Sequence, residues 1–139
     1  MSLQEKFEEL SVYTLSLGDQ EFIHQHAVDA FAVQTADETT KTIKIFFALA
    51  GLYLSVEKNY TGKEVQNAHV QMSRNKEAFS HFNVVLPEFR GEITVADVLH
   101  LPLGAARNDM ICRWRDAVWA AFGEQRSEIV ALTESLLNR

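Results

Sequence analysis

The stretch IKIFFALAGLYLSV, residues 43–56, has Lys44 and Ser55 as its only clearly polar side chains. With its flanking residues it predicts one helix over residues 41–58 that is apolar on nearly every side. Such a helix is normally central, because neighbouring elements must cover its whole circumference. Its longest apolar run, residues 45–54, is about half as long as a membrane-spanning helix requires. We therefore expect it to form the centre of a globular domain.

Amphipathic patterns on both sides of this helix predict the rest of the fold. The capping-box sequence Thr61-x-x-Glu64 marks the start of a helix that we expect to end near Phe79. Residues 81–93 have no helical period and contain a proline and a glycine, so we expect a loop there. The other expected helices cover residues 4–10, 20–36, 95–101, 106–122 and 124–137, and residues 11–17 are expected to be extended. The sequence thus predicts one all-α domain over residues 1–139, a bundle of four main helices plus short flanking helices.

The composition is that of an acidic globular protein. The 139 residues include 13 Lys and Arg against 19 Asp and Glu, which gives a net charge of −6. This balance disfavours nucleic-acid binding, which requires a basic face. The single cysteine, Cys112, excludes an internal disulfide and fits a reducing compartment, and we interpret it as a packed thiol. The N-terminal residues lack the apolar core of a signal peptide. We expect a soluble cytoplasmic protein that binds neither nucleic acid nor membranes.

Two histidines are candidates for a polar site inside the bundle. His26 falls near the middle of the apolar face of its helix. If the chain turns back near Glu38 and again near Tyr60, both His26 and His69 come level with Gly51, where a glycine leaves room. On this geometry we expect the two imidazoles to meet in one layer of the bundle.

A carboxylate near these histidines would complete a metal site of the 2-His-1-carboxylate type. Asp29 follows His26 by one turn, and Glu57 lies on an apolar face near the end of its helix. His24 is a further candidate, because Glu21-x-x-His24 has the spacing used in di-iron bundles, although the helix directs it away from His26. The predicted metal ligands are thus His26, His69, Asp29, Glu57 and His24, and the metal would be zinc, nickel, iron or manganese. The alternative, core histidines with hydrogen-bond partners and no metal, stays open because the sequence has neither His-x-x-x-His nor Cys-x-x-Cys.

A second candidate site is a pocket for a small anion. Arg115 lies on an otherwise apolar helix face, and Trp119 and Phe122 would form the walls of such a pocket. Because a buried charge is costly without a partner, we expect Arg115 to pair with Glu57 or Asp29 unless it reaches solvent at the helix end.

Two helices have apolar residues on more sides than one neighbour would cover. Residues 43–56 are apolar nearly all round, and Trp114 and Trp119 lie on opposite flanks of another helix. This pattern indicates either heavy burial within one chain or a contact between two chains. We expect a homodimer.

Four segments of the chain resemble an uncharacterised family of small bacterial proteins, a domain of unknown function. They are HQHAVDAFAVQ (residues 24–34), GLYLSVE (51–57), TVADV (94–98) and WRDAVW (114–119). Members often have another histidine where this chain has Thr35, and some carry an N-terminal cysteine pair that this chain lacks. The resemblance implies a shared fold and no particular chemistry. It directs attention to His24, Asp29 and Gln34 beside His26, and we count Gln34 with Arg115 and Trp119 as candidate ligand-binding residues.

At the level of the fold alone, the chain also resembles the metal-dependent four-helix bundles of the DNA-damage-inducible thiol-transferase type. Those proteins use a histidine pair four residues apart, which this chain lacks. Two functions therefore stay open. The first is a binding or structural module, homodimeric and able to bind a small-molecule ligand. The second is a divalent-metal-dependent enzyme that acts on a small molecule through a His/carboxylate site in the bundle.

Overall fold

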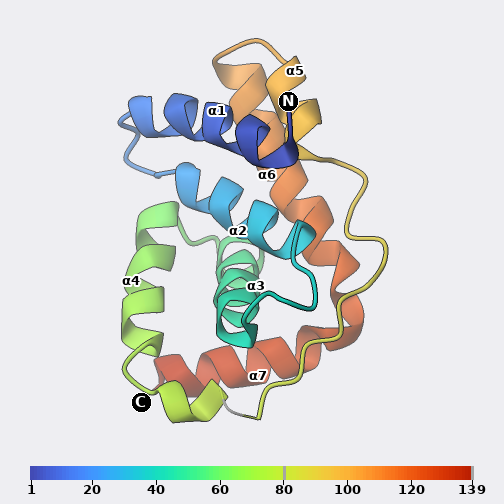
Figure 1. Cartoon of the computed structure of the whole chain (residues 1–139). Coiled ribbons are helices and arrows are strands. Elements are labelled where there is room, and N and C mark those ends of the chain that lie inside the picture. Colours follow the sequence, from blue (N-terminus) through green and yellow to red (C-terminus); the bar gives the residue numbers. More distant parts are fainter. Residues whose placement is uncertain (80, 139) are drawn as a thin grey trace.

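The computed structural model describes residues 1–79 and 81–138, and every regular element in this part of the chain is a helix. Figure 1 shows α3 at the centre, with α2, α4, α6 and α7 packed around it. The helices are α1 (Leu3–Ser16), α2 (His24–Gln34), α3 (Thr42–Glu57), α4 (Gly62–Met72), η1 (Lys76–Phe79), α5 (Val95–His100), α6 (Ala105–Ala121), η2 (Gly123–Gln125) and α7 (Arg126–Leu137). The predicted all-α fold is confirmed. Within the described residues, none of the helices combines the length and the apolar character that a membrane crossing requires.

The central position of α3 follows from its apolar sequence. Nearly all side chains from Ile45 to Leu54 are buried, and Phe47 is partly buried against the core. α2 packs along one side of α3, while α4, α6 and α7 cover other sides. The prediction of one buried helix is confirmed, and each of its ends lies one residue inside the expected range.

α1 is longer than the sequence predicted, and the expected extended stretch over residues 11–17 was wrong. The helix begins with a capping box between Ser2 and Glu5 and continues to Ser16. Leu10 and Thr14, one turn apart, are both buried. Packing of this face therefore keeps the second half helical, although its Val-Tyr-Thr sequence favours a strand.

α2 is shorter than predicted, because it begins at His24 and not near residue 20. Phe22 has a φ of 56°, a left-handed conformation that an α-helix excludes. The same loop is bound to the first turn of α4, where the Gly62 N–H donates to the Glu21 carbonyl oxygen at 2.7 Å. A Cβ on Gly62 would lie 1.8 Å from the Phe22 carbonyl oxygen, so only glycine fits there.

α4 is also shorter than predicted. It ends at Met72, and the separate turn η1 covers the last residues of the expected helix. Backbone hydrogen bonds to the third preceding residue, from Arg74 to Gln71 and from Asn75 to Met72, tighten the chain at this point.

The predicted loop before α5 is fastened to the end of α2 by Arg90. Its Nη1 donates to the carbonyl oxygens of Val33 at 3.1 Å, Gln34 at 3.3 Å and Ala36 at 2.5 Å. The last carbonyls of a helix have no partner within the helix, so this side chain supplies one. The loop is thereby held along one side of the molecule (Figure 1).

Candidate functional site

A buried carboxyl group lies at the contact between α2 and α3. Asp29 on α2 is only 3% exposed. Its Oδ2 faces α3 at Gly51, where a Cβ would lie 2.0 Å from that oxygen. Glycine in a helix interior costs roughly 0.5–1 kcal/mol relative to alanine. Gly51 therefore lowers the stability of the helix but leaves space for the carboxyl group.

The environment of Asp29 favours its protonated form. Oδ1 accepts a hydrogen bond from Gln25 Nε2 at 3.0 Å, while Oδ2 has no hydrogen-bond partner among the described residues. No ion pair in this part of the chain involves Asp29. Burial raises the pKa of Asp29 well above its ordinary value, and the hydrogen bond from Gln25 opposes this only in part. Because Oδ1 already accepts a hydrogen bond, the proton belongs on Oδ2.

A cleft of about 380 Å³ opens beside this carboxyl group. Its lining residues come from α2, α3 and α4, which pack against one another (Figure 1). Most of its wall is aliphatic or aromatic, and the polar residues in it come from all three helices. The residues that line the cleft are Gln25, Val28, Asp29, Ala32, Ile43, Lys44, Phe47, Ala48 and His69. An apolar cleft with a few polar groups is the usual form of a small-molecule site.

His69 lies in the wall of the cleft as a neutral ring with one defined proton. Its Nε2 donates to the carbonyl oxygen of Phe47 at 2.7 Å, and its ring stacks on that of Phe47 with centroids 5.2 Å apart. Burial lowers the pKa of His69. A neutral imidazole protonated at Nε2 leaves Nδ1 as a hydrogen-bond acceptor. The cleft thus combines an acid that holds its proton with an uncharged histidine.

His26 does not line the cleft with His69, so the structure does not bring the two predicted imidazoles together there. It is 4% exposed, and its Nδ1 has no hydrogen-bond partner in the described part of the chain. Burial, together with the positive charge of Arg115, lowers the pKa of His26 to about 4, and the negative charge of Asp19 opposes the shift. His26 is therefore a neutral core residue.

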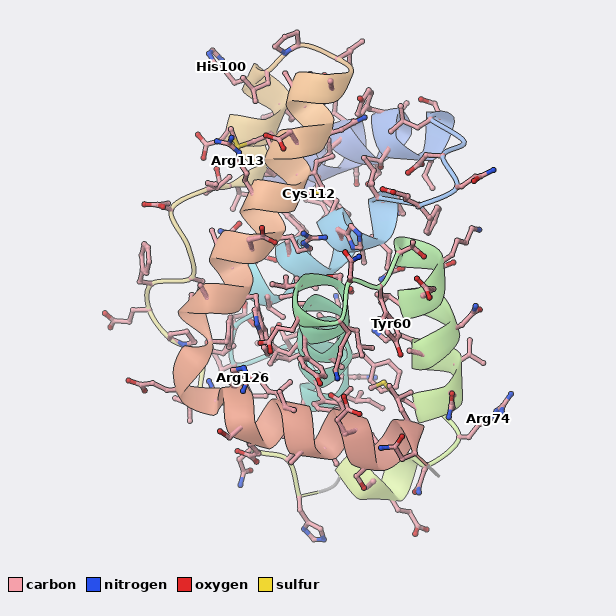
Figure 2. All side chains as sticks on the ribbon, turned by 180° about the vertical axis from the view of Figure 1, so that it is seen from behind. Tyr60, Arg74, His100, Cys112, Arg113 and Arg126 are labelled. Atoms are coloured by element: carbon pink, nitrogen blue, oxygen red, sulfur yellow. The ribbon has the colours of Figure 1, made fainter. Side chains whose placement is uncertain are left out.

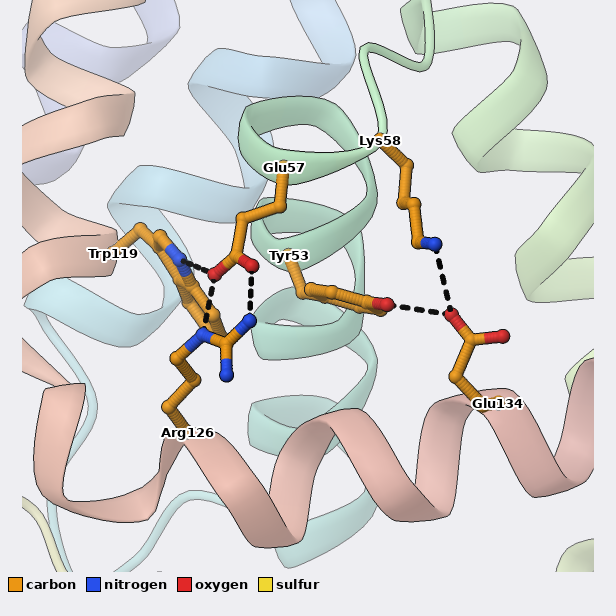
Figure 3. Close-up of polar contacts among 6 residues, drawn as sticks. All are labelled: Tyr53, Glu57, Lys58, Trp119, Arg126 and Glu134. Atoms are coloured by element: carbon orange, nitrogen blue, oxygen red, sulfur yellow. Dashed lines mark hydrogen bonds and ion pairs between the residues drawn. The ribbon is translucent and has the colours of Figure 1, made fainter.

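The other two predicted metal ligands have partners elsewhere. His24 Nδ1 lies 2.8 Å from Thr14 Oγ1 and connects α2 to α1. Glu57 accepts a hydrogen bond from Trp119 Nε1 at 2.8 Å and forms a two-pronged ion pair with Arg126 (Figure 3). Across residues 1–79 and 81–138, no group of three or more His, Cys, Asp or Glu side chains is placed to hold a metal ion. Of the predicted ligands, Asp29 and His69 share one cleft.

The contacts of Glu57 belong to a polar cluster that fastens α3 to α6 and α7 (Figure 3). Beside it, the Tyr53 hydroxyl donates to Glu134 at 2.5 Å, and Lys58 approaches the same carboxylate at 4.0 Å. Burial, assisted by the negative charge of Glu134, raises the pKa of Tyr53 to about 12. Each polar group here has a partner from the chain itself, so we interpret the cluster as structural.

The predicted ligand-binding residues each have a partner within the chain. Arg115 pairs with Asp116 on its own helix, and neither Glu57 nor Asp29 is its partner. Trp119 is bound to Glu57. Gln34 accepts from Trp114 Nε1 at 2.9 Å and donates to the Arg90 and Ile93 carbonyl oxygens at 3.2 and 2.7 Å, so it connects α2 to α6 and the loop before α5.

Cys112 has the environment of a packed thiol. Figure 2 shows it on α6, beside Arg113. The residue is half-buried, and burial raises the pKa of its thiol, which the positive charge of Arg115 opposes only in part. A raised pKa disfavours the thiolate, which is the reactive form.

The comparison with protein families gives one match. The sequence pattern of a family of unknown function, DUF5946, matches residues 4–123. The chain belongs to this family. The resemblance seen in the sequence is thereby confirmed. No curated protein and no solved structure is similar enough to the chain to count as a match.

All residues that line the cleft lie inside the part of the chain that matches DUF5946, whereas α7 lies beyond it. Sequence reasoning found Asp29 and His69 but missed Gln25 and Phe47 as cleft residues. Lys44 did leave a signal, because it interrupts an otherwise apolar helix. A charge in such a position marks the edge at which the helix surface reaches solvent.

Proposed function

We propose that the protein binds a small molecule in the cleft between α2, α3 and α4, with the Asp29 carboxyl group as a hydrogen-bond donor at the inner wall. The observation that carries the proposal is a carboxyl group beside an apolar cleft whose Oδ2 has no hydrogen-bond partner among the described residues, on a residue that is only 3% exposed. Perturbed acids in clefts are typical of functional sites.

The energetics support this interpretation. A buried polar group without a hydrogen-bond partner destabilises the folded state by about 1–3 kcal/mol. The glycine that makes room for it adds roughly 0.5–1 kcal/mol relative to alanine. An aliphatic residue at position 29 and an alanine at position 51 would avoid both costs. A ligand with an oxygen or nitrogen acceptor would offset the first cost by accepting a hydrogen bond from the Asp29 carboxyl group.

The size and lining of the cleft agree with a small organic ligand. Its volume of about 380 Å³ lies in the range of about 300–1,000 Å³ that is usual for such sites. Phe47 and Ile43 offer apolar surface, while Gln25 and His69 offer polar groups. This function belongs to the binding-module class that the sequence favoured, and we propose that it operates in the cytoplasm.

The homodimer stays a prediction. The two features that suggested it are explained within one chain, because α3 is covered by other helices and both Trp114 and Trp119 are buried. Light scattering at increasing protein concentration tests it, and a constant monomer mass would contradict it.

The binding proposal is tested by titrating the ¹⁵N-labelled protein with a fragment library and recording amide NMR spectra. We expect the shift changes to centre on Gln25, Lys44 and His69. Ala32→Phe and Val28→Phe, which fill the cleft, should abolish binding, whereas Ala106→Phe on the exposed first turn of α6 should leave it intact. Shift changes that centre elsewhere, or that persist in both filled variants, would contradict the proposal.

A further inference from the structure

The cleft has a charge opposite to that of the protein as a whole. The Lys44 side chain is exposed at the cleft, and its ammonium group has no hydrogen bond or ion pair to another of the described residues. The only other ionisable groups in the lining are Asp29, which burial favours in its protonated form, and His69, which burial favours in its neutral form. The lining therefore carries one positive charge, while the chain has a net charge of −6.

The beginning of α3 lies at the same part of the cleft as Lys44. Ile43 and Lys44 belong to the first turn of this helix and also line the cleft. Within the described part of the chain, the N-cap residue of α3 forms no side-chain capping hydrogen bond, and the first turn contains no acidic residue. The first N–H groups of a helix have no partner within it and stabilise negative charge. The lysine and the helix N-terminus thus favour the same sign of ligand charge.

From these features we propose that the ligand is a small organic monocarboxylate with an apolar body. Its carboxylate would lie at the Lys44 ammonium group and the start of α3, and its body would pack on Phe47 and Ile43. An independent indication that a ligand binds here is Asp29, an acid only 3% exposed that lines the same cleft and whose Oδ2 has no hydrogen-bond partner among the described residues. The inference rests on the proposed function, because it names the chemical class of ligand for the same cleft.

The negative charge of the ligand can be isolated with a matched pair of probes, phenylbutanoate and phenylbutanamide, which differ only in the charged end. We expect isothermal titration to give about fivefold tighter binding of the carboxylate, because a solvent-exposed ion pair and a helix N-terminus each contribute modestly. Added salt should weaken the binding of the carboxylate and leave that of the amide unchanged.

Lys44→Gln should reduce the preference for the carboxylate to the part that the N-terminus of α3 contributes, without changing the affinity for the amide. Lys58→Gln is the control, because Lys58 is an exposed lysine at the opposite end of α3 that does not line the cleft, and this variant should keep the full preference. Equal affinities of the two probes in the unmodified protein, or a preference that is undiminished in Lys44→Gln, would overturn the inference and leave the proposed function standing. Failure of both probes and of the fragment library to bind would overturn both.

Discussion

The Asp29 carboxyl group and Gly51 fit each other across the contact between α2 and α3, since a methyl group at position 51 would lie 2.0 Å from Asp29 Oδ2. Each residue is unfavourable by itself, one as a buried acid and the other as a glycine within a helix. Together they place a carboxyl group beside an apolar cleft. Their effects on stability should therefore be strongly coupled, which makes the pair the first feature to test.

A double-mutant cycle measures this coupling. Gly51→Ala should destabilise the protein by about 1–3 kcal/mol, because the carboxyl group must move out of an overpacked contact. In an Asp29→Ala background the same change should cost much less, because only a tight contact with Val65 Cγ1 at 3.1 Å remains and a gain in helix propensity of up to about 1 kcal/mol opposes it. Urea unfolding of the four proteins provides the free energies. Additive effects of the two substitutions would show that the residues do not interact.

Asp29→Asn should change how stability depends on pH. The pKa of Asp29 is raised in the folded protein above the ordinary 3.8, so the unfolded chain releases its proton first as the pH rises. The contribution of Asp29 is thus fully present below about pH 3.8 and is lost as the pH rises to the folded pKa, by at most about 1.4 kcal/mol per pH unit.

The asparagine variant has no such loss. Relative to the unmodified protein it should therefore become more stable as urea unfolding is repeated at rising pH above about 4, until the folded pKa of Asp29 is passed. Any constant offset from the amide group cancels in this comparison. A difference between the two proteins that does not change with pH would contradict a raised pKa of Asp29.

His26 should act in the opposite direction. Its folded pKa is about 4 against an ordinary 6.5, so the unfolded chain takes up a proton first as the pH falls. Its contribution to stability is complete above about pH 6.5 and is lost toward pH 4, by an amount on the order of 3 kcal/mol. His26→Gln should flatten this part of the acid unfolding profile, whereas His100→Gln, at an exposed position, should leave it unchanged. Identical profiles for the two variants would show that His26 does not titrate at a shifted pKa.

The centre of the fold could be predicted from the sequence, because the apolar run around Gly51 dictates burial whatever its neighbours are. The same reasoning found Asp29 and His69, since each is a polar residue near an apolar face. It did not foresee that His69 lines a cleft without His26. A helix turns by about 100° per residue, so a small error in where a turn lies redirects a side chain to another neighbour.

The predicted starts and ends of the helices were wrong for a different reason. The left-handed Phe22 and the hydrogen bond from Gly62 to Glu21 delay the start of α2, and both depend on a contact between segments far apart in the sequence. No local propensity reveals such a contact. For Lys44, in contrast, the sequence does indicate that the side chain is exposed, because it interrupts an apolar helix. That Lys44 lines a cleft could not be predicted, because this depends on which helices pack together there.

Gly62→Ala tests whether this contact positions the cleft. A Cβ would lie 1.8 Å from the Phe22 carbonyl oxygen, and a backbone atom cannot move aside as a flexible side chain can. We expect a loss of about 2 kcal/mol or more in urea unfolding, although alanine favours a helix over glycine. Because α4 carries His69, the shifted helix should also weaken binding of phenylbutanamide in the cleft. Gly123→Ala is a suitable control, because a Cβ there meets no atom within 4 Å. Equal stability of the two variants would show that the first turn of α4 yields freely and does not fix the position of His69.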